Sequence, residues 1–372
     1  MRIGLNLLHA RPAIGGGWTY IANLLEAVDR FSEDHEYVAF VNAVSRTLVS
    51  PGLRMKIVPV EFGASQITRV LYENTCLQAQ ARRERLDLMH WFANNDGVYN
   101  AVPAAVTVYD LHPIVIPGTF SAPQRAFLSA GIRRAVRRGG RLLPISQATA
   151  TDLMRRCGAS PARMTVIPPI LEACFQRPDS AAIEHVRRTY GLPSVFWLYV
   201  ASLNRHKNHV RLLEAYAEVR RRRPDAWPLV LRADRKRRDE HVFQRIEELN
   251  LKAHVLFLPT QDRTEMAGLY GAASALVYPS VFEGGAMPIC EGLVCGCPVV
   301  AADLPVIREC ARDAARYFNP FSVPEIASAM EEMQQDPAAG RAKAELAREQ
   351  LERYRGPRVA AALAQAYRDA VS

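Results

Sequence analysis

Two glutamates, Glu283 and Glu291, lie eight positions apart in a segment whose pattern predicts a strand, a turn and a helix. The apolar run 275–278 predicts the strand, and two glycines follow Glu283 directly. Pro288 suits the first turn of the helix, because the N–H that proline lacks needs no partner there. We therefore expect Glu283 just before a helix N-terminus and Glu291 about one turn inside that helix.

This arrangement suits a ligand that carries both anionic groups and hydroxyls. The free N–H groups of a first helical turn, approached past glycines without side chains, bind anionic or oxygen-rich groups. A carboxylate accepts hydrogen bonds from two neighbouring hydroxyls, so two carboxylates fit two vicinal diols. Phosphates together with two sets of diols describe a nucleotide sugar. An ordinary amphipathic helix with a solvated glutamate would leave the glycines and the flanking strands unexplained.

The segment from Tyr278 to Ala302 resembles the Glu-x7-Glu signature of the family 4 retaining glycosyltransferases, which have the two-domain GT-B fold. The resemblance rests on the strand, Pro-Ser-x-x-Glu-Gly, the helix proline, the second glutamate and Cys-Gly-x-Pro-Val-Val together. It implies that Glu283 contacts the transferred sugar and that Glu291 contacts the ribose of the donor. It also implies donor contacts for the residues of the turn, which are Gly284, Gly285, Ala286 and Met287. Ala286 stands where the family commonly has glycine.

A second motif, Ser202-Leu-Asn-Arg-His-Lys-Asn208, follows another predicted strand. Asn208 is a candidate N-cap of the next helix, which would place Arg205 and Lys207 at a helix N-terminus. Two cations at a positive helix end repel each other unless an anion is held there, although both could be ordinary surface residues. The motif resembles the family's Arg-Lys-Asn motif, which implies that Arg205 and Lys207 act on the donor diphosphate, with Ser202 beside them. The additional arginine that the family often has near Ser202 is absent.

Two segments of the first half complete the expected site. Gly15-Gly16-Gly17 resembles the family's N-terminal loop, where the backbone at Gly16 and Gly17 approaches acceptor and donor phosphate; as sequence it is neither G-x-G-x-x-G nor a Walker loop. Tyr109-Asp110-Leu111-His112 resembles a segment in which many members have a sugar-contacting histidine. Tyr109 stands at that position and His112 follows three residues later, so both residues, with Asp110, are candidates for the sugar and acceptor side.

Strands and helices alternate along the chain, which predicts an α/β protein with parallel sheets. The predicted strands are 2–6, 37–41, 55–60, 87–91, 105–109, 142–145 and 165–167, then 196–201, 229–232, 255–258, 275–278 and 298–301. With the resemblance, this pattern indicates a GT-B fold of two Rossmann-like, doubly wound domains that face a central cleft. The predicted parts are an N-terminal acceptor-binding domain (1–170), a linker (171–192), a C-terminal nucleotide-sugar-binding domain (193–352) and a C-terminal helix that packs back on the N-terminal domain (353–372).

Charge and composition bear on the partners. The chain has 372 residues and a formal net charge of +9, with the surplus in clusters of arginine. One predicted helix carries Arg133, Arg134, Arg137, Arg138 and Arg141, and further clusters are 220–223 and 235–238. Such clusters are either solvated faces or sites of attraction to an anionic membrane surface, worth ~1 kcal/mol per basic residue. No zinc-finger, helix-turn-helix or stacking motif indicates nucleic acid.

The expected location is the cytoplasm, either free or peripheral on the cytoplasmic face of the inner membrane. No signal peptide is recognised, and no apolar run reaches the ~20 residues that a spanning helix requires. The seven cysteines form no pattern of metal ligands, and an odd number without export indicates a reducing compartment.

Together these features predict a retaining hexosyltransferase. It would move a hexose from a nucleotide-diphosphate sugar to a saccharide or lipid-linked acceptor in bacterial surface polysaccharide or lipopolysaccharide synthesis. The resemblance favours a donor of the GDP-mannose type, with UDP-sugars next. No Asp-x-Asp occurs, so neither a metal nor another cofactor is expected. The alternatives are a non-catalytic sugar-nucleotide-binding subunit and a sugar-nucleotide epimerase of the same architecture.

Overall fold

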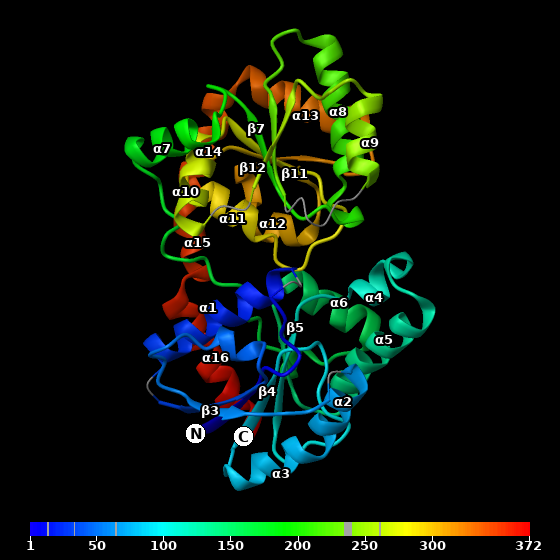
Figure 1. Ribbon diagram of the computed structural model, residues 1–372, viewed down its shortest axis with the longest axis vertical. Coiled ribbons are helices and arrows are strands. Elements are labelled where there is room, and N and C mark those ends of the chain that lie inside the picture. Colours follow the sequence, from blue (N-terminus) through cyan, green and yellow to red (C-terminus); the bar gives the residue numbers. More distant parts are fainter. Residues whose placement is uncertain (13–14, 33, 64, 234–239, 260–261) are drawn as a thin grey trace. The chain divides into compact units, whose positions relative to one another are not determined.

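The computed structural model describes residues 1–12, 15–32, 34–63, 65–233, 240–259 and 262–372. They form two compact units, the first made of residues 1–170 with 353–372 and the second of residues 171–352. Each unit contains one six-stranded sheet, and helices cover both faces of each sheet (Figure 1). The arginine cluster predicted at 235–238 lies outside the described residues.

The sheet of the first unit is parallel throughout, in the order β3-β2-β1-β4-β5-β6. Its strands are β1 Arg2–Asn6, β2 Glu36–Val41, β3 Lys56–Pro59, β4 Leu88–Trp91, β5 Ala104–Val108 and β6 Arg141–Pro144. Its helices are α1 Gly15–Phe31, α2 Gln66–Asn74, α3 Cys76–Arg83, α4 His112–Val115, α5 Ala122–Arg137, α6 Gln147–Cys157 and α16 Gly356–Val371.

Two apolar layers hold this sheet between its helices. On one face, Leu24 of α1 and Leu363 of α16 pack with alternate strand residues such as Leu5. On the other face, helices α3, α5 and α6 pack against the strand residues of opposite parity. The alternation follows from strand geometry, because successive side chains point to opposite faces of a sheet. Helix α16 lies beside α1, so the last residues of the chain belong to the first unit (Figure 1).

The second sheet is also parallel, in the order β12-β11-β10-β7-β8-β9. Its strands are β7 Trp197–Val200, β8 Leu229–Arg232, β9 Val255–Leu258, β10 Ala275–Tyr278, β11 Val299–Ala302 and β12 Ala315–Phe318. Its helices are α7 Ser180–Tyr190, α8 His209–Arg222, α9 Glu240–Glu248, α10 Arg263–Ala272, α11 Met287–Val294, α12 Pro305–Ala311, α13 Val323–Gln335, α14 Pro337–Leu346 and α15 Arg348–Leu351.

Both units share one topology. Counted within its unit and started from β9, the second sheet runs third-second-first-fourth-fifth-sixth, which is also the order of the first sheet. This is the doubly wound arrangement, in which the chain direction across the sheet reverses between the first and fourth strands. Ligands of such sheets bind at that switch point, outside the carboxyl ends of the strands. In the second unit the switch point lies between β7 and β10.

The structure confirms the α/β class and corrects four details. Arg141, predicted on one helix with Arg133 and Arg137, is the first residue of β6, because Gly139 and Gly140 follow the end of α5. Residues 165–167 form no strand: they donate two backbone hydrogen bonds to β6, but the prolines at 168 and 169 end the pairing. Strand β12 was missed, because its four residues include an exposed arginine and lie at the sheet edge. The segment 171–192, interpreted as a linker, contains α7, which packs on α10 within the second unit.

Candidate active site in the second unit

The two predicted motifs meet at the switch point of the second sheet. The loop after β7 contains a 3₁₀ turn over Arg205–Lys207, and the loop after β10 contains Glu283. The backbone N–H of Val281 donates to the carbonyl of His206 at 2.9 Å, which joins the two loops. Residues far apart in the sequence therefore lie together where a doubly wound sheet binds its ligand.

Lys207 and Glu283 form an ion pair at the centre of this site. The Lys207 Nζ lies 2.6 Å from Glu283 Oε1, and their side chains are only 16% and 8% exposed. The Tyr278 hydroxyl donates to the same carboxylate oxygen at 2.8 Å. The Lys207 ammonium also lies 5.9 Å from the centroid of the Tyr278 ring. One aromatic residue at the end of β10 thus orients both charged groups.

The environment of Glu283 favours its charged form. Burial alone would raise the pKa of this carboxyl, but the nearby Lys207 ammonium opposes burial, and hydrogen bonds from Lys207, Ser280 and Tyr278 reinforce it. The net effect lowers the pKa of Glu283 below its ordinary value. Glu283 is therefore a carboxylate at neutral pH and accepts hydrogen bonds.

The loop that carries Lys207 is fixed by buried polar contacts. The Tyr199 hydroxyl donates to the Lys207 carbonyl at 2.6 Å. Asn208 precedes α8, as the sequence predicted, but the amide caps no helical N–H. Its backbone is left-handed with φ of 61°, and its side chain donates instead to the carbonyls of Pro279 and Pro320, at 2.9 and 2.7 Å. Asn208 thus joins the start of α8 to the loops that follow β10 and β12.

The turn between the two glutamates leads directly into α11. Gly284 and Gly285 are partly exposed, and Ala286 is buried with a left-handed φ of 48°. Helix α11 begins at Met287, one residue before Pro288, and no side chain caps its first turn. A backbone end without a side-chain cap, next to two residues without side chains, is the feature that suits an anionic ligand.

Glu291 occupies a different environment from Glu283. It is 5% exposed, and Tyr270 of α10 donates its hydroxyl to Oε2 at 2.8 Å. The guanidinium of Arg263 lies 3.6 Å from Oε1. Burial raises the pKa of Glu291, and Arg263 and the Tyr270 hydrogen bond only partly oppose it, so the net direction is upward.

Arg205 and Lys207, predicted to act together on a diphosphate, point in different directions in this structure. Arg205 is exposed, and its Nη2 lies 3.4 Å from Nε2 of His241 in α9. Arg205 and His241 line a cavity of about 490 Å³ beside the start of α8. His209 lines the same cavity. Ser202 accepts a hydrogen bond from the Asn204 amide at 3.1 Å.

In the first unit, Tyr109 and His112 have different surroundings. The Tyr109 ring packs edge-on against Tyr20, and a Cβ on Gly17 would lie 3.7 Å from it. The buried Tyr109 hydroxyl has no hydrogen-bond partner among the described residues. His112 contacts the Thr119 hydroxyl at 3.0 Å and packs on Phe120, and its backbone N–H donates to Asp110. These contacts favour Tyr109 over His112 as a ligand contact, since Gly17 leaves room beside the Tyr109 ring and no atom of the described residues would lie within 4 Å of a Cβ at Gly16.

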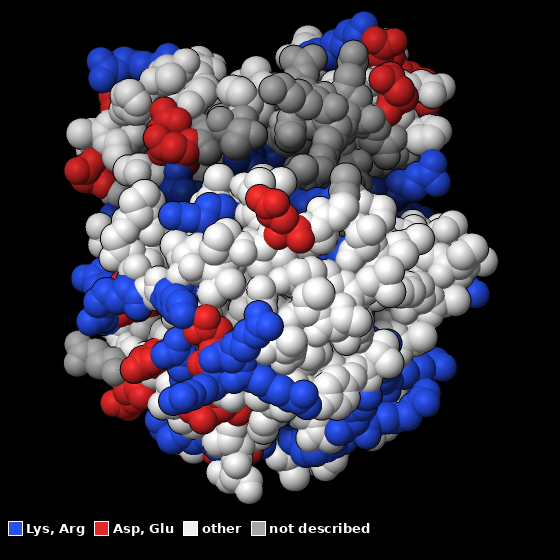
Figure 2. All heavy atoms as spheres, turned by 60° about the horizontal axis from the view of Figure 1, so that its bottom comes forward, with Lys and Arg blue, Asp and Glu red and all other residues white. Residues whose placement is uncertain are grey.

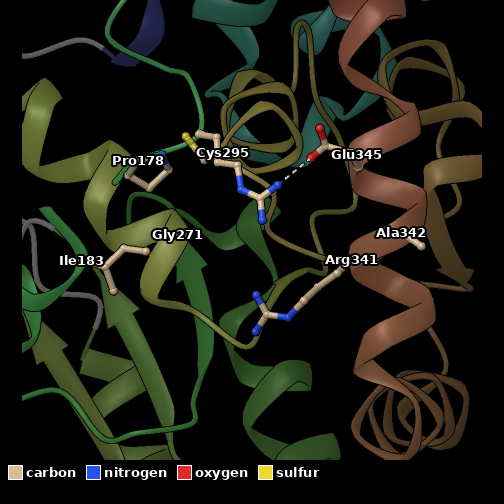
Figure 3. Close-up of a pocket in the computed structure, with 9 residues that line it drawn as sticks. Pro178, Ile183, Gly271, Cys295, Arg341, Ala342 and Glu345 are labelled. Atoms are coloured by element: carbon tan, nitrogen blue, oxygen red, sulfur yellow. Dashed lines mark hydrogen bonds and ion pairs between the residues drawn. The ribbon is translucent and has the colours of Figure 1, made fainter. Parts of the chain in front are cut away.

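A second cavity of the second unit lies apart from these residues (Figure 3). It has a volume of about 280 Å³ and is lined by residues of α10, α14 and the end of α11, with Arg177 and Pro178. Two of its lining residues pair with each other, since the Arg177 Nη1 lies 3.4 Å from Glu345 Oε2. None of the predicted site residues lines this cavity.

Sequence reasoning missed the groups that position the two glutamates. Tyr199 is the second-last residue of β7 and Tyr278 the last of β10, where an aromatic residue with a polar tip is a signal that could have been read. Tyr270 and Arg263 lie on α10, with no local pattern to mark them. Within the described residues there is no cluster of three or more His, Cys, Asp or Glu that could hold a metal ion. In the same part of the chain, no helix has the length and apolar character needed to cross a membrane.

Family models match both halves of the chain. Residues 14–172 match the model described as Glycosyltransferase Family 4, and residues 188–352 match the model described as Glycosyl transferases group 1. The two models together span both units.

The chain is also similar to curated proteins and to solved structures. The chain is 25% identical over 63% of its length to the O-antigen chain mannosyltransferase RfbU of Salmonella typhimurium, and the match covers 62% of that protein. It is 23% identical over 70% of its length to the O-antigen chain mannosyltransferase B of Escherichia coli, with 68% of that protein covered. The fold is similar to that of a sucrose-phosphate synthase from Thermosynechococcus elongatus, with a TM-score of 0.79, 19% identity and coverage of 99% of this chain and 98% of the other.

Proposed function

This chain belongs to the GT-B glycosyltransferases described by the family 4 and group 1 models, and we propose that it transfers mannose from GDP-mannose to a saccharide or lipid-linked acceptor. The proposed process is the synthesis of a bacterial surface polysaccharide or lipopolysaccharide. The support for mannose is the match to two O-antigen mannosyltransferases, each spanned over about two thirds of its length.

The observation that carries the proposal is the buried Lys207–Glu283 pair at the switch point, beside the N-terminus of α11. In the proposed complex, Lys207 stabilises the negative charge that develops on the departing diphosphate. Glu283 accepts hydrogen bonds from the sugar hydroxyls, and Glu291 accepts them from the ribose. Gly284 and Gly285 let the phosphates approach the start of α11.

The proposed transfer retains the configuration at the sugar carbon. The bond from that carbon to the diphosphate oxygen breaks, and the acceptor oxygen forms a bond on the same face. The acceptor proton passes to the departing diphosphate oxygen. Because Lys207 and the N-terminus of α11 supply positive charge, the mechanism needs no metal ion. Activity is therefore expected to persist in excess EDTA.

The acceptor is proposed to bind the first unit, where Tyr109 is available. A lipid-linked acceptor brings a membrane surface, and one face of this unit suits it. The exposed side chains of Ile67 and Leu71 on α2 lie near Val98 and Tyr99, because Asn74 of α2 accepts a hydrogen bond from the Val98 N–H.

Two arginines contact the segment that contains Val98 and Tyr99. Arg82 contacts the Tyr99 hydroxyl, and Arg138 donates to the Gly97 carbonyl, which joins α3 and the end of α5 to the same face. The exposed arginines of α3 and of the C-terminal end of α5 are Arg82, Arg83, Arg133, Arg137 and Arg138. We call these five arginines with Ile67, Leu71, Val98 and Tyr99 the α2–α3–α5 face. The single acidic residue within the three helices, Glu73, is buried and paired with Arg69.

Figure 2 shows two groups of basic side chains on the face turned toward the viewer. The group at the lower left is mixed with acidic side chains, and the group at the lower right has few acidic side chains near it. A face with both exposed apolar residues and arginines fits an anionic membrane interface, where aliphatic side chains insert and basic side chains meet headgroups.

The test is transfer by the purified chain with GDP-mannose, and with UDP-glucose as the comparison donor, in the presence of lipid extract as the source of acceptor. Mannose that appears in a lipid-linked product, with GDP released in equal amount and undiminished by EDTA, supports the proposal. A nucleotide sugar that binds but is never consumed identifies a non-catalytic subunit. A sugar that is altered while it remains on its nucleotide identifies an epimerase.

A further inference from the structure

Glu291 is a buried carboxylate whose charge depends on one neighbour. Tyr270 donates a hydrogen bond to Oε2 but carries no charge. The cation next to the carboxylate is Arg263, 3.6 Å from Oε1. A carboxylate taken out of water becomes protonated unless an opposite charge compensates it, and the protonated form accepts hydrogen bonds from a diol poorly.

Arg263 is itself held by a second carboxylate. Its Nε donates to Glu172 Oε1 at 2.8 Å, and Nη2 contacts the same oxygen. The guanidinium lies 5.1 Å from the centroid of the Phe175 ring, so its plane packs on an aromatic residue of the same segment. Two fixed contacts leave Nη1 directed toward Glu291.

Among the described residues, charged and titratable groups approach Glu291 from three places in the second unit. Arg263 and Tyr270 approach from α10, Glu172 from the segment before α7, and Arg232 from β8, while Glu291 in turn influences Cys174. Burial is the largest influence and raises the pKa of Glu291; Arg263 is the largest influence that lowers it. Glu172 raises the pKa of Glu291 further. Arg263 lowers this pKa more than Arg232 does, and its effect must also offset that of Glu172.

We propose that Arg263 is the positioning residue of Glu291: anchored by Glu172 and Phe175, it keeps this buried carboxylate charged and oriented to accept hydrogen bonds from the ribose diol. The inference rests on the proposed function, because it takes Glu291 as the ribose ligand. The inference adds Arg263, a residue that no motif marks. It also gives the two carboxylates beside Arg263 different roles: Glu291 binds the ligand and Glu172 anchors Arg263.

The consequence is a dependence on pH that a merely structural arginine would not produce. In Arg263→Gln, the titration midpoint of Glu291 should rise by about one to three pH units. The smaller shift is expected, because Arg263 is 43% exposed and water screens it. Below the new midpoint, the Kd for a nucleotide should increase by up to about tenfold per pH unit, since binding then requires loss of a proton. Arg263→Lys should keep the charge and most of the wild-type profile.

Two measurements on the full chain test this. The first follows side-chain carboxyl signals of ¹³C-labelled glutamate by NMR against pH, with Glu291→Gln to assign the signal. The second measures the Kd of GDP, with UDP in parallel, by calorimetry from pH 5.5 to 8.5. Arg222→Gln is the matched control, because Arg222 is 42% exposed and also bridges two carboxylates, Glu218 and Glu331, on a different side of the unit.

A second variant protects the test against misfolding. Glu172→Gln keeps an oxygen that can accept from Arg263 but removes the competing negative charge, so it should lower the midpoint of Glu291, whereas Arg263→Gln raises it. The double variant should lie between the two single variants. Midpoints of Glu291 that stay unchanged in both single variants would overturn the inference.

The outcomes also separate this inference from the proposed function. If Glu291→Gln binds GDP and UDP as tightly as wild type at every pH, Glu291 is not the ribose ligand and the proposed site fails, whatever Arg263 does. If Glu291→Gln weakens nucleotide binding but Arg263→Gln keeps a flat pH profile, the site stands and the role of Arg263 is wrong.

Discussion

Lys207 and Glu283 are each other's counter-ions, and both are nearly buried, so a change at one alters the state of the other. Lys207→Ala leaves an unpaired buried carboxylate, which is expected to cost about 3–5 kcal/mol of folding free energy. Turnover should fall as well, with kcat/KM lower by roughly two to three orders of magnitude, because the cation stabilises the leaving group. Lys207→Arg should recover only part of the rate, since a planar guanidinium does not reproduce a compact ammonium. The folding cost follows from the ion pair with Glu283, which the sequence alone does not reveal.

The pH dependence of stability distinguishes the pair from an ordinary contact. In wild type the pKa of folded Glu283 is lowered, so its contribution is present above the unfolded pKa and is lost as pH falls through the folded value. Without Lys207, burial dominates and the folded pKa rises, so the variant loses stability as pH increases. The cost of Lys207→Ala should therefore be larger at pH 8 than at pH 5, measured by denaturant unfolding. The double variant Lys207→Met with Glu283→Gln should regain stability but no activity; recovered turnover in it would exclude the leaving-group role.

The two glutamates should fail in different ways. Glu291→Ala removes the proposed ribose acceptor, and one charged hydrogen-bonding group is worth ~1.5–3 kcal/mol, or about ten- to a hundredfold in affinity. GDP and GDP-mannose should lose this affinity equally. Glu283→Gln should leave GDP binding close to wild type while transfer collapses, because its proposed partner is the sugar. Affinities measured by calorimetry, beside steady-state rates, check both; an equal loss for GDP in the two variants contradicts the assignment.

At the scale of elements, the turn that starts α11 contains a residue in an unfavourable conformation. Ala286 has φ of 48° and is buried, and a left-handed residue with a Cβ costs roughly 1–2 kcal/mol. Ala286→Gly removes that cost but adds ~0.5–1 kcal/mol of chain entropy, so a gain of up to about 1.5 kcal/mol is expected. Ala286→Val should destabilise by more than 1 kcal/mol. Urea unfolding of both variants measures this, and equal stability of all three proteins would show that the turn is not strained.

The elements show why some features were predictable from sequence. The cap of α6 is a local feature, since Ser146 accepts from the N–H of Thr149 three residues later. Strands of the buried sheets were found for the same reason, because their apolar runs are local signals. Asn208 was assigned to a cap because the same local rule applies, but its amide reaches carbonyls 71 and 112 residues away.

The candidate site also has features that the sequence predicts and contacts that it does not. Its two motifs could be read from spacing, yet the contact between Lys207 and Glu283 joins residues 76 positions apart and depends on the order of the strands. The divergence of Arg205 toward His241 follows from the position of α9 beside α8, which no sequence pattern specifies. Local chemistry was predictable; the partners supplied by the folded sheet were not.

At the scale of the whole molecule, the α2–α3–α5 face should make binding to anionic vesicles depend on both charge and apolar insertion. The chain should co-sediment with vesicles of phosphatidylcholine and phosphatidylglycerol and much less with phosphatidylcholine alone. Arg133→Gln with Arg137→Gln should weaken binding roughly thirtyfold, at ~1 kcal/mol per charge. Ile67→Ser with Leu71→Ser should also weaken it, but without changing its dependence on salt, because insertion of aliphatic groups is not screened.

Net charge alone would give a different result, and a control within the chain separates the two explanations. Arg221→Gln with Arg222→Gln removes the same charge from α8 of the second unit, outside the α2–α3–α5 face. If binding reflects the overall charge of +9, this pair should weaken it as much as the α5 pair does. If the face is the docking surface, the α8 pair should bind nearly as wild type at 0.15 M salt, where charges more than ~8 Å from the lipid are screened. Equal losses for the two arginine pairs, or full binding by the Ile67 and Leu71 variant, would remove the face from the proposal and leave the acceptor to be delivered from solution.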